Sequence, residues 1–175
     1  MKKTTLNLLI AGSLIALAVT LRLLPHPANF APVGAIAIFG GAILPRRHAV
    51  WAPVVAMVLS DLIIGLHSLV ALTWGCYALI ALASSYGLRR PTVARGIGLT
   101  FGASLFFFAV TNFGVWLTSG MYAHSWRGLD LCYTMALPFF RNTALSDLTY
   151  TGLLFGVYAL ATRISYGLLQ SAKQS

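Results

Sequence analysis

Residues 6–24 read LNLLIAGSLIALAVTLRLL, a run of about 19 residues in which Arg22 carries the only charge. At a rise of 1.5 Å per residue, about 20 apolar residues in a helix cross the hydrocarbon core of a bilayer. The preceding Met1-Lys2-Lys3 imitates the start of a signal peptide. The run is longer than the roughly 7–15 apolar residues of a signal-peptide core, so we interpret it as a first transmembrane helix.

The rest of the chain has the same apolar character. Of its 175 residues, 58% are hydrophobic and 9% are charged, whereas soluble domains carry about 25% charged residues. Most of this apolar surface must therefore face lipid, which excludes a soluble enzyme, a disordered tail and a disulfide-stapled secreted domain. The net charge of +9 comes from short basic pairs between apolar runs. We therefore expect the lipid bilayer, and no nucleic acid, as a partner.

Five further apolar runs follow the first, and the earliest of them has only about 12 residues. We predict an all-α integral membrane protein, a single domain over residues 1–175 with six transmembrane helices. The connection 118–142 is the longest, and we expect it to cap the bundle, with a short surface helix at 131–140. The five runs are Val33–Leu44, Val50–Leu66, Leu69–Tyr86, Gly96–Leu117 and Thr143–Tyr166.

The distribution of Lys and Arg predicts the orientation, because cytoplasmic loops carry the excess of basic residues. With six spans, nine basic residues fall on one side and three on the other, so we expect both termini in the cytoplasm. The connections 25–32, 67–68 and 118–142 then face outward. The nine are Lys2, Lys3, Arg46, Arg47, Arg89, Arg90, Arg95, Arg163 and Lys173, and the three are Arg22, Arg127 and Arg141.

Polar side chains collect in the outer half of these predicted helices. Asp61 lies roughly 8 Å from the outer end of the third helix, and Cys76 lies roughly 10 Å below the start of the fourth. Asp147 falls in the first outer turn of the sixth. All three carboxylates, three of the four histidines and both cysteines share this half. The asymmetry predicts a polar cavity that opens to the outside.

Each candidate residue also has a simpler explanation. Asp61 could pair with an arginine, Arg141 could anchor at the headgroups, and Asn112 could bond a neighbouring helix. Cys76 could pack as a small apolar residue, and a disulfide between Cys76 and Cys132 stays open. The chain has no Walker motif, His-Glu-x-x-His, Cys-x-x-Cys or Gly-x-Ser-x-Gly, so it cannot itself hydrolyse ATP.

Small residues at helical spacing predict where helices approach one another closely. Gly12-x-x-x-Ala16 and Ala37-x-x-x-Gly41 both fit such a contact. For each motif we favour packing within the chain over docking onto another membrane subunit.

Several short strings resemble a known family over roughly residues 20–158. The family consists of small bacterial membrane proteins similar to the substrate-binding S-components of energy-coupling factor (ECF) vitamin transporters. The string Trp74-Gly75-Cys76-Tyr77 in the fourth helix resembles the BtuM-type, cobalamin-transporting members. The other strings are RLLPHPANF at 22–30, FGG at 39–41, LSDL at 59–62, TNFGVW at 111–116 and PFFRNTALSD at 138–147.

This resemblance implies a six-helix, S-component-like bundle in the bacterial inner membrane with a corrinoid site facing the periplasm. Cys76 would be the cobalt ligand, and its thiolate could also remove an axial ligand such as cyanide. A thiolate is a soft donor that suits a transition metal. The chain would need no cofactor of its own, cobalamin being the substrate, and an energy-coupling membrane subunit is a candidate partner. The resemblance carries over His26, Asp61, Tyr77 and Arg141 as ligand-binding residues, to which we add the polar Asn29 and Asn112.

Three alternatives stay open. The chain could take up a different vitamin-like solute, with Cys76 merely packing. It could be a membrane enzyme whose thiol acts on a ligand or lipid. It could also be a structural subunit that binds no small ligand.

Overall fold

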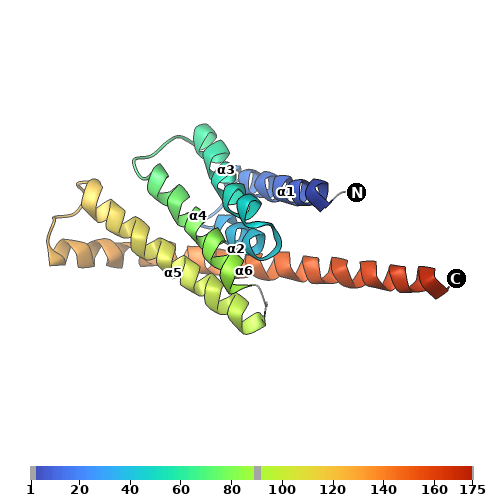
Figure 1. Cartoon of the computed structure of the whole chain (residues 1–175). Coiled ribbons are helices and arrows are strands. Elements are labelled where there is room, and N and C mark those ends of the chain that lie inside the picture. Colours follow the sequence, from blue (N-terminus) through green and yellow to red (C-terminus); the bar gives the residue numbers. More distant parts are fainter. Residues whose placement is uncertain (1–2, 89–91, 175) are drawn as a thin grey trace.

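A computed structural model describes residues 3–88 and 92–174, with side chains described for residues 4–88 and 92–164. The described part is all helical and has no strand. The helices follow one another up and down the bundle (Figure 1). They are α1 (Lys3–Leu23), α2 (Val33–Ile43), α3 (Arg46–Ile64), α4 (Val70–Gly87), α5 (Val93–Thr118) and α6 (Trp126–Gln174).

Five of these helices are long and apolar enough to cross a membrane, and α2 is the shorter exception. Large apolar side chains such as Phe101, Leu105 and Leu153 point outward, as expected of helices whose surroundings are lipid. These features confirm an all-helical, membrane-associated protein. The 11 residues of α2 span about 16 Å, short of the roughly 30 Å hydrocarbon core.

Helix α2 lies inside the bundle. It packs mainly on α4 and α3 and also contacts α6, α5 and α1, and all of its residues from Val33 to Gly41 are buried. A β-carbon on Gly41 would lie 2.6 Å from the Ala81 carbonyl oxygen and 2.6 Å from Ser84 Cβ. The absence of that atom is what lets α2 and α4 approach so closely, which confirms packing within the chain at Gly41.

The expectation for the other small-residue motif is wrong. Gly12 and Ala16 are exposed on α1, and a β-carbon on Gly12 would meet nothing within 4 Å. The motif does not pack within the chain, because α1 presents a different face, including Leu14 and Ala18, to the core.

Helix α6 differs most from the sequence prediction. Its 49 residues form one helix, about 73 Å long, so there is neither a separate helix at 131–140 nor a new start at Thr143. Pro138 lies inside the helix, although proline removes one backbone hydrogen bond there. Packing on α5 holds this turn: the Phe140 ring lies 4.8 Å from that of Phe108, and Tyr133 Oη donates to the Ala109 carbonyl at 2.6 Å.

Because α6 begins at Trp126, Asp147 lies deep in the helix rather than in its first outer turn. This carboxyl therefore lies in the interior of the bundle and not at a wet helix end.

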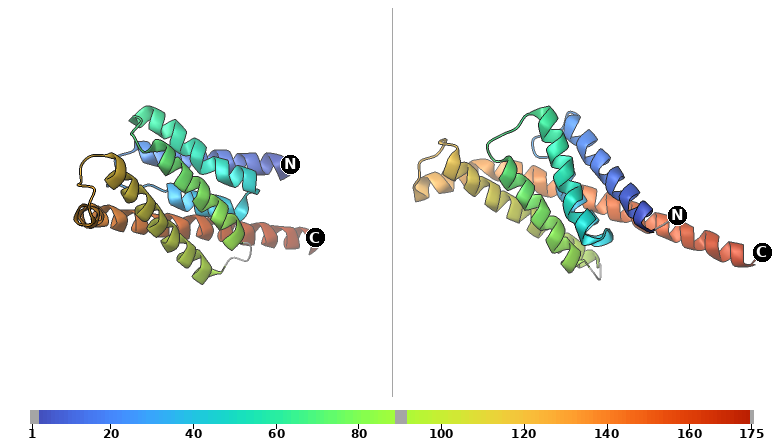
Figure 2. Two further views of the ribbon diagram at one scale, coloured as in Figure 1. Left: turned by 60° about the vertical axis from the view of Figure 1, so that its left-hand side comes forward. Right: turned by 45° about the horizontal axis from the view of Figure 1, so that its top comes forward.

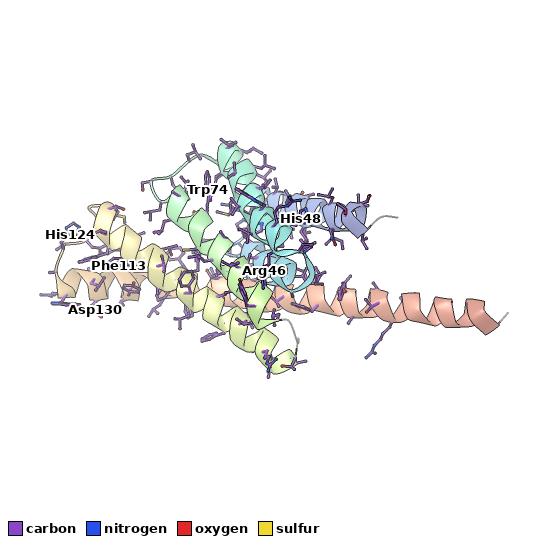
Figure 3. The ribbon with its side chains drawn as sticks, viewed as in Figure 1. Arg46, His48, Trp74, Phe113, His124 and Asp130 are labelled. Carbon is purple, nitrogen blue, oxygen red and sulfur yellow. The ribbon has the colours of Figure 1, made fainter. Side chains whose placement is uncertain are left out.

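Both termini lie at the same end of the molecule, which we call the termini end; α6 projects beyond the other helices there (Figures 1 and 2). The connections 65–69 and 119–125 lie at the opposite end, which we call the site end. Loop 24–32, which follows α1, also belongs to the site end. Figure 3 shows His124 and Asp130 at the tip of the site end, well away from Arg46 and His48 at the start of α3.

Candidate functional site

A buried ion pair joins three helices near the site end. Arg22, in the last turn of α1, places Nη2 2.8 Å from Asp61 Oδ1 on α3. Trp74 Nε1, on α4, donates to Asp61 Oδ2 at 2.7 Å, and Figure 3 labels this side chain near the start of α4. Asp61 is 1% exposed, so both of its oxygens are satisfied by protein donors rather than by water.

The guanidinium of Arg22 is fixed from its other side as well. Its Nη1 lies 2.6 Å from Ser60 Oγ and 2.9 Å from Met57 Sδ, both on α3. Three contacts from α3 therefore restrict one long side chain to one orientation. We call Arg22, Ser60, Asp61 and Trp74 the Arg22 network.

A cavity of about 360 Å³ lies beside the Arg22 network, beneath the loops of the site end. Its size is within the usual range for small-molecule pockets, about 300–1,000 Å³. All six helices and the connections 24–32 and 65–69 contribute to its walls. The polar side chains that line it are Arg22, His26, Asn29, His67, Thr73, Tyr77, Thr111, Asn112 and Thr143.

Aromatic rings form the other part of the cavity wall. Tyr77 stacks on Phe107 with ring centroids 4.9 Å apart and planes 27° apart. Phe108 and Phe140, which also line the cavity, have centroids 4.8 Å apart. Apolar walls with a few fixed polar groups are the usual composition of a small-molecule site, and flat rings add stacking surfaces.

The loop over the cavity is held in place by α6. Asn142 Nδ2 donates to the Ala28 carbonyl at 2.9 Å, and Ser146 Oγ donates to the Ala31 carbonyl at 3.1 Å. Within the loop, the Phe30 amide donates to the Pro27 carbonyl at 2.9 Å, and Asn29 has a φ of 60°. Asparagine tolerates this left-handed conformation better than most residues, which explains why it occupies the turn.

Four of the seven residues predicted for the site line the cavity, namely His26, Asn29, Tyr77 and Asn112. Asp61 lies behind the wall and acts through Arg22, as the ion-pair explanation predicted. Arg141 is exposed and does not line the cavity. Two residues of α helix turn through about 200°, so Arg141 points away from the side on which Thr143 lines the cavity.

Cys76 is buried at 2% exposure but does not line the cavity either. Cys76 precedes Tyr77 by one residue, so its side chain lies about 100° around α4 from the Tyr77 side chain, which lines the cavity. Cys76 and Cys132 are both free thiols, so the disulfide that the sequence left open is not formed. Within the described residues there is no group of three or more potential metal ligands.

Sequence reasoning missed three members of the Arg22 network. Arg22, Ser60 and Trp74 appeared there only in the orientation count and in the strings that carry the resemblance, and none of them was predicted as a site residue. A signal was nevertheless present in the sequence. The base Arg22 lies near the outer end of the first predicted helix, and the acid Asp61 lies near the outer end of the third, so the two side chains have a similar depth in the membrane. Opposite charges at one depth in a membrane pair with each other.

These features define the class of protein: a helical bundle of the membrane type with a polar and aromatic cavity between its helices at one end. The chain belongs to a family of unknown function, DUF6580, whose model matches residues 2–169. No curated protein and no solved structure matches it.

Proposed function

We propose that this protein is a six-span membrane protein of the S-component type that captures a vitamin-like solute on the outer side for uptake, and that cobalamin is its ligand. The observation that carries the proposal is the cavity at the site end, with fixed polar groups and an aromatic wall. In this proposal the protein lies in the bacterial inner membrane with the cavity facing the periplasm. An energy-coupling membrane subunit is the candidate partner for the release step.

The chemistry of the wall supports a ligand with flat apolar faces and neutral amide arms. The stacked Tyr77 and Phe107 offer a surface for a ring, and Asn29 and Asn112 offer amide partners. Arg22 brings little net charge, because Asp61 neutralises it. A largely uncharged ligand therefore suits this site better than an anion does.

Cobalt ligation by Cys76 requires a change of shape. A volume of about 360 Å³ lies near the lower end of the usual range for small-molecule pockets, about 300–1,000 Å³, whereas a corrinoid is a large ligand. Loop 24–32 would have to move outward, and α4 would have to turn to bring the Cys76 thiol to the cavity. Removal of an upper axial ligand such as cyanide would then be a side activity of the bound thiolate.

The size of the cavity favours a second candidate, a compact vitamin-like solute with one planar ring. Such a ligand fits the present volume and stacks on Tyr77 and Phe107 without rearrangement. In that case Cys76 is a packing residue. A thermal-shift measurement with a series of compact water-soluble vitamins tests this candidate, because a ligand at one hundred times its Kd stabilises the folded state by about 2.7 kcal/mol.

The absorption spectrum of protein purified with cyanocobalamin tests the leading proposal. We expect bound cobalamin with a spectrum shifted from that of the free vitamin. We expect Cys76→Ser to lose the shift, because serine is a poor ligand for a soft metal. Cys132→Ser is the matched control, since Cys132 is also a buried free thiol, and it should keep the shift.

The outcomes separate the two candidates. Cobalamin bound equally well and with one spectrum by the wild type and Cys76→Ser would leave a corrinoid binder but remove the cobalt–thiolate contact. Absence of bound cobalamin, together with a thermal shift from a compact vitamin, would replace the leading candidate by the second.

A further inference from the structure

A second buried carboxyl, that of Asp147 on α6, lies against the first turn of α2. It is 4% exposed and sits between α2, α5 and its own helix α6. Ser104 Oγ on α5 lies 2.7 Å from Asp147 Oδ2, and the Ala35 amide, in the first turn of α2, donates to the carboxyl. Gly34 leaves the room for this approach, because a β-carbon there would overlap Asp147 Oδ1.

The position explains how α2 begins. The residue before α2 is Pro32, which offers no side-chain cap, so the first amides of the helix need an acceptor from elsewhere. Asp147 supplies it from α6. Ala31 and Val33, directly before this contact, line the cavity, as does Thr143 one turn away on α6. Asp147 therefore lies immediately behind the cavity wall.

No cation pairs with this carboxyl among the residues whose side chains are described. Asp61, in contrast, forms an ion pair with Arg22. The two intramembrane acids therefore differ in whether a cation lies beside them. An ionised carboxylate without a cation is costly in a medium of low polarity, and such a group takes up a proton instead.

The hydrogen bonds around Ser104 indicate where that proton is. Ser104 Oγ carries one hydrogen but lies within hydrogen-bond distance of two acceptors, Asp147 Oδ2 at 2.7 Å and the Thr100 carbonyl at 3.1 Å. A hydroxyl has one donor and two acceptor lone pairs. If Asp147 donates to Ser104 Oγ, the serine donates to Thr100, and each short contact has its own proton.

We propose that Asp147 is an intramembrane proton-binding site: a neutral carboxylic acid whose proton links Ser104 of α5 to the start of α2. When α2 moves away and water enters, the acid ionises and releases the proton. The closed arrangement therefore binds one more proton than the open one. By linkage, rising pH favours opening, and falling pH favours the closed arrangement.

Few other titratable groups face Asp147. Helix α2 has none, and α5 has only Arg95, nine residues before Ser104 and thus about 13 Å away along the helix. On α6, Arg141 is exposed and Tyr150 packs on Phe30. Tyr77 on α4 interacts electrostatically with the carboxyl.

Infrared spectroscopy tests the proposal without knowledge of the ligand. The chain contains three aspartates and no glutamate, so the carbonyl band of a protonated carboxyl is simple to assign. We expect one such band at neutral pH for protein in a detergent without carbonyl groups. Asp147→Asn should abolish the band, whereas Asp130→Asn, which changes an exposed residue of the site end, should leave it unchanged.

Ser104→Ala keeps the test decisive if Asp147→Asn does not fold. It removes the acceptor of the Asp147 proton, so the band should persist but move to the higher frequency of a carboxyl with a weaker hydrogen bond. Absence of the band in the wild type overturns the proposal. So does a band that survives Asp147→Asn, or one that stays in place in Ser104→Ala.

Discussion

The two buried acids show how a single partner decides what a carboxyl does. Asp61 has Arg22 at 2.8 Å and the indole of Trp74 at 2.7 Å, so each of its oxygens has a protein donor. Asp147 has a hydroxyl and a backbone amide instead. The same side chain therefore serves as the charged anchor of Arg22 at one place and as the cap of α2 at the other.

Removal of the charge on Asp61 should destabilise the fold. Asp61→Asn leaves Arg22 partly buried beside a neutral group, and breaking a buried ion pair in this way costs about 3 kcal/mol or more. We expect a clearly lower unfolding temperature in detergent micelles. Asp130→Asn changes an exposed residue and should lie within about 0.5 kcal/mol of the wild type. Equal stability of the two variants would contradict a structural role for the Arg22 network.

The same charge should matter for binding. Without Asp61, Arg22 loses one of its anchors and its position in the cavity wall. We expect Asp61→Asn to weaken cobalamin binding about tenfold, the scale of one charge-assisted hydrogen bond. Equilibrium dialysis on the folded fraction measures the change, with Asp130→Asn as the control. If both variants bound cobalamin with the wild-type affinity, Arg22 would not contribute to ligand binding in the cavity.

For single residues, the sequence predicted the depth of a side chain along its helix, but not whether that side chain faces the cavity. Counting residues places Asp61 and Cys76 inside the membrane because the rise per residue is fixed. The rotation of each helix depends on partners distant in sequence. One position separates Cys76 from Tyr77, yet only Tyr77 reaches the cavity.

At the scale of elements, the first five predicted helices agree with the structure to within about four residues at each end. Long apolar runs bounded by turn residues account for that agreement. The sixth does not agree: its start was predicted at Thr143, but the helix runs from Trp126 through Pro138, a residue that locally disfavours helix. Contacts of Phe140 and Tyr133 with α5 outweigh those local signals, and such contacts cannot be read from one segment alone.

The close approach of α2 and α4 gives a prediction for one element pair. Gly41→Ala would put a methyl group 2.6 Å from the Ala81 carbonyl and from Ser84 Cβ. Overpacking of this kind costs about 1–3 kcal/mol, so we expect a lower unfolding temperature. Gly12→Ala is the matched control: its β-carbon meets nothing within 4 Å, and alanine favours helix by nearly 1 kcal/mol. Comparable destabilisation by both variants would argue against this packing.

At the scale of the whole molecule, the short α2 decides the topology. It cannot cross a bilayer alone, but α1 and α3 run toward the same end (Figure 2), so loop 24–32 and α2 together return the chain. The helix order places three basic residues at the termini end: Arg46 at the start of α3, Arg95 in the first turn of α5, and Arg163 in the last part of α6. Lys2, Arg89 and Arg90, which the orientation argument also used, lie outside the described residues.

Reporter fusions test that topology. A reporter fused at the C-terminus should report the cytoplasm, and one inserted near Ala123 in the connection 119–125 should report the outside, because the basic excess at the termini end stays cytoplasmic. A third reporter at Pro45, between α2 and α3, should report the cytoplasm if loop 24–32 and α2 complete a crossing. If the reporter at Pro45 reports the outside, α2 turns back without crossing and the termini must lie on opposite sides. Their shared end in the bundle (Figure 1) makes that result incompatible with this fold, whereas a reversal of all three signals would keep the fold and move the cavity to the cytoplasmic face.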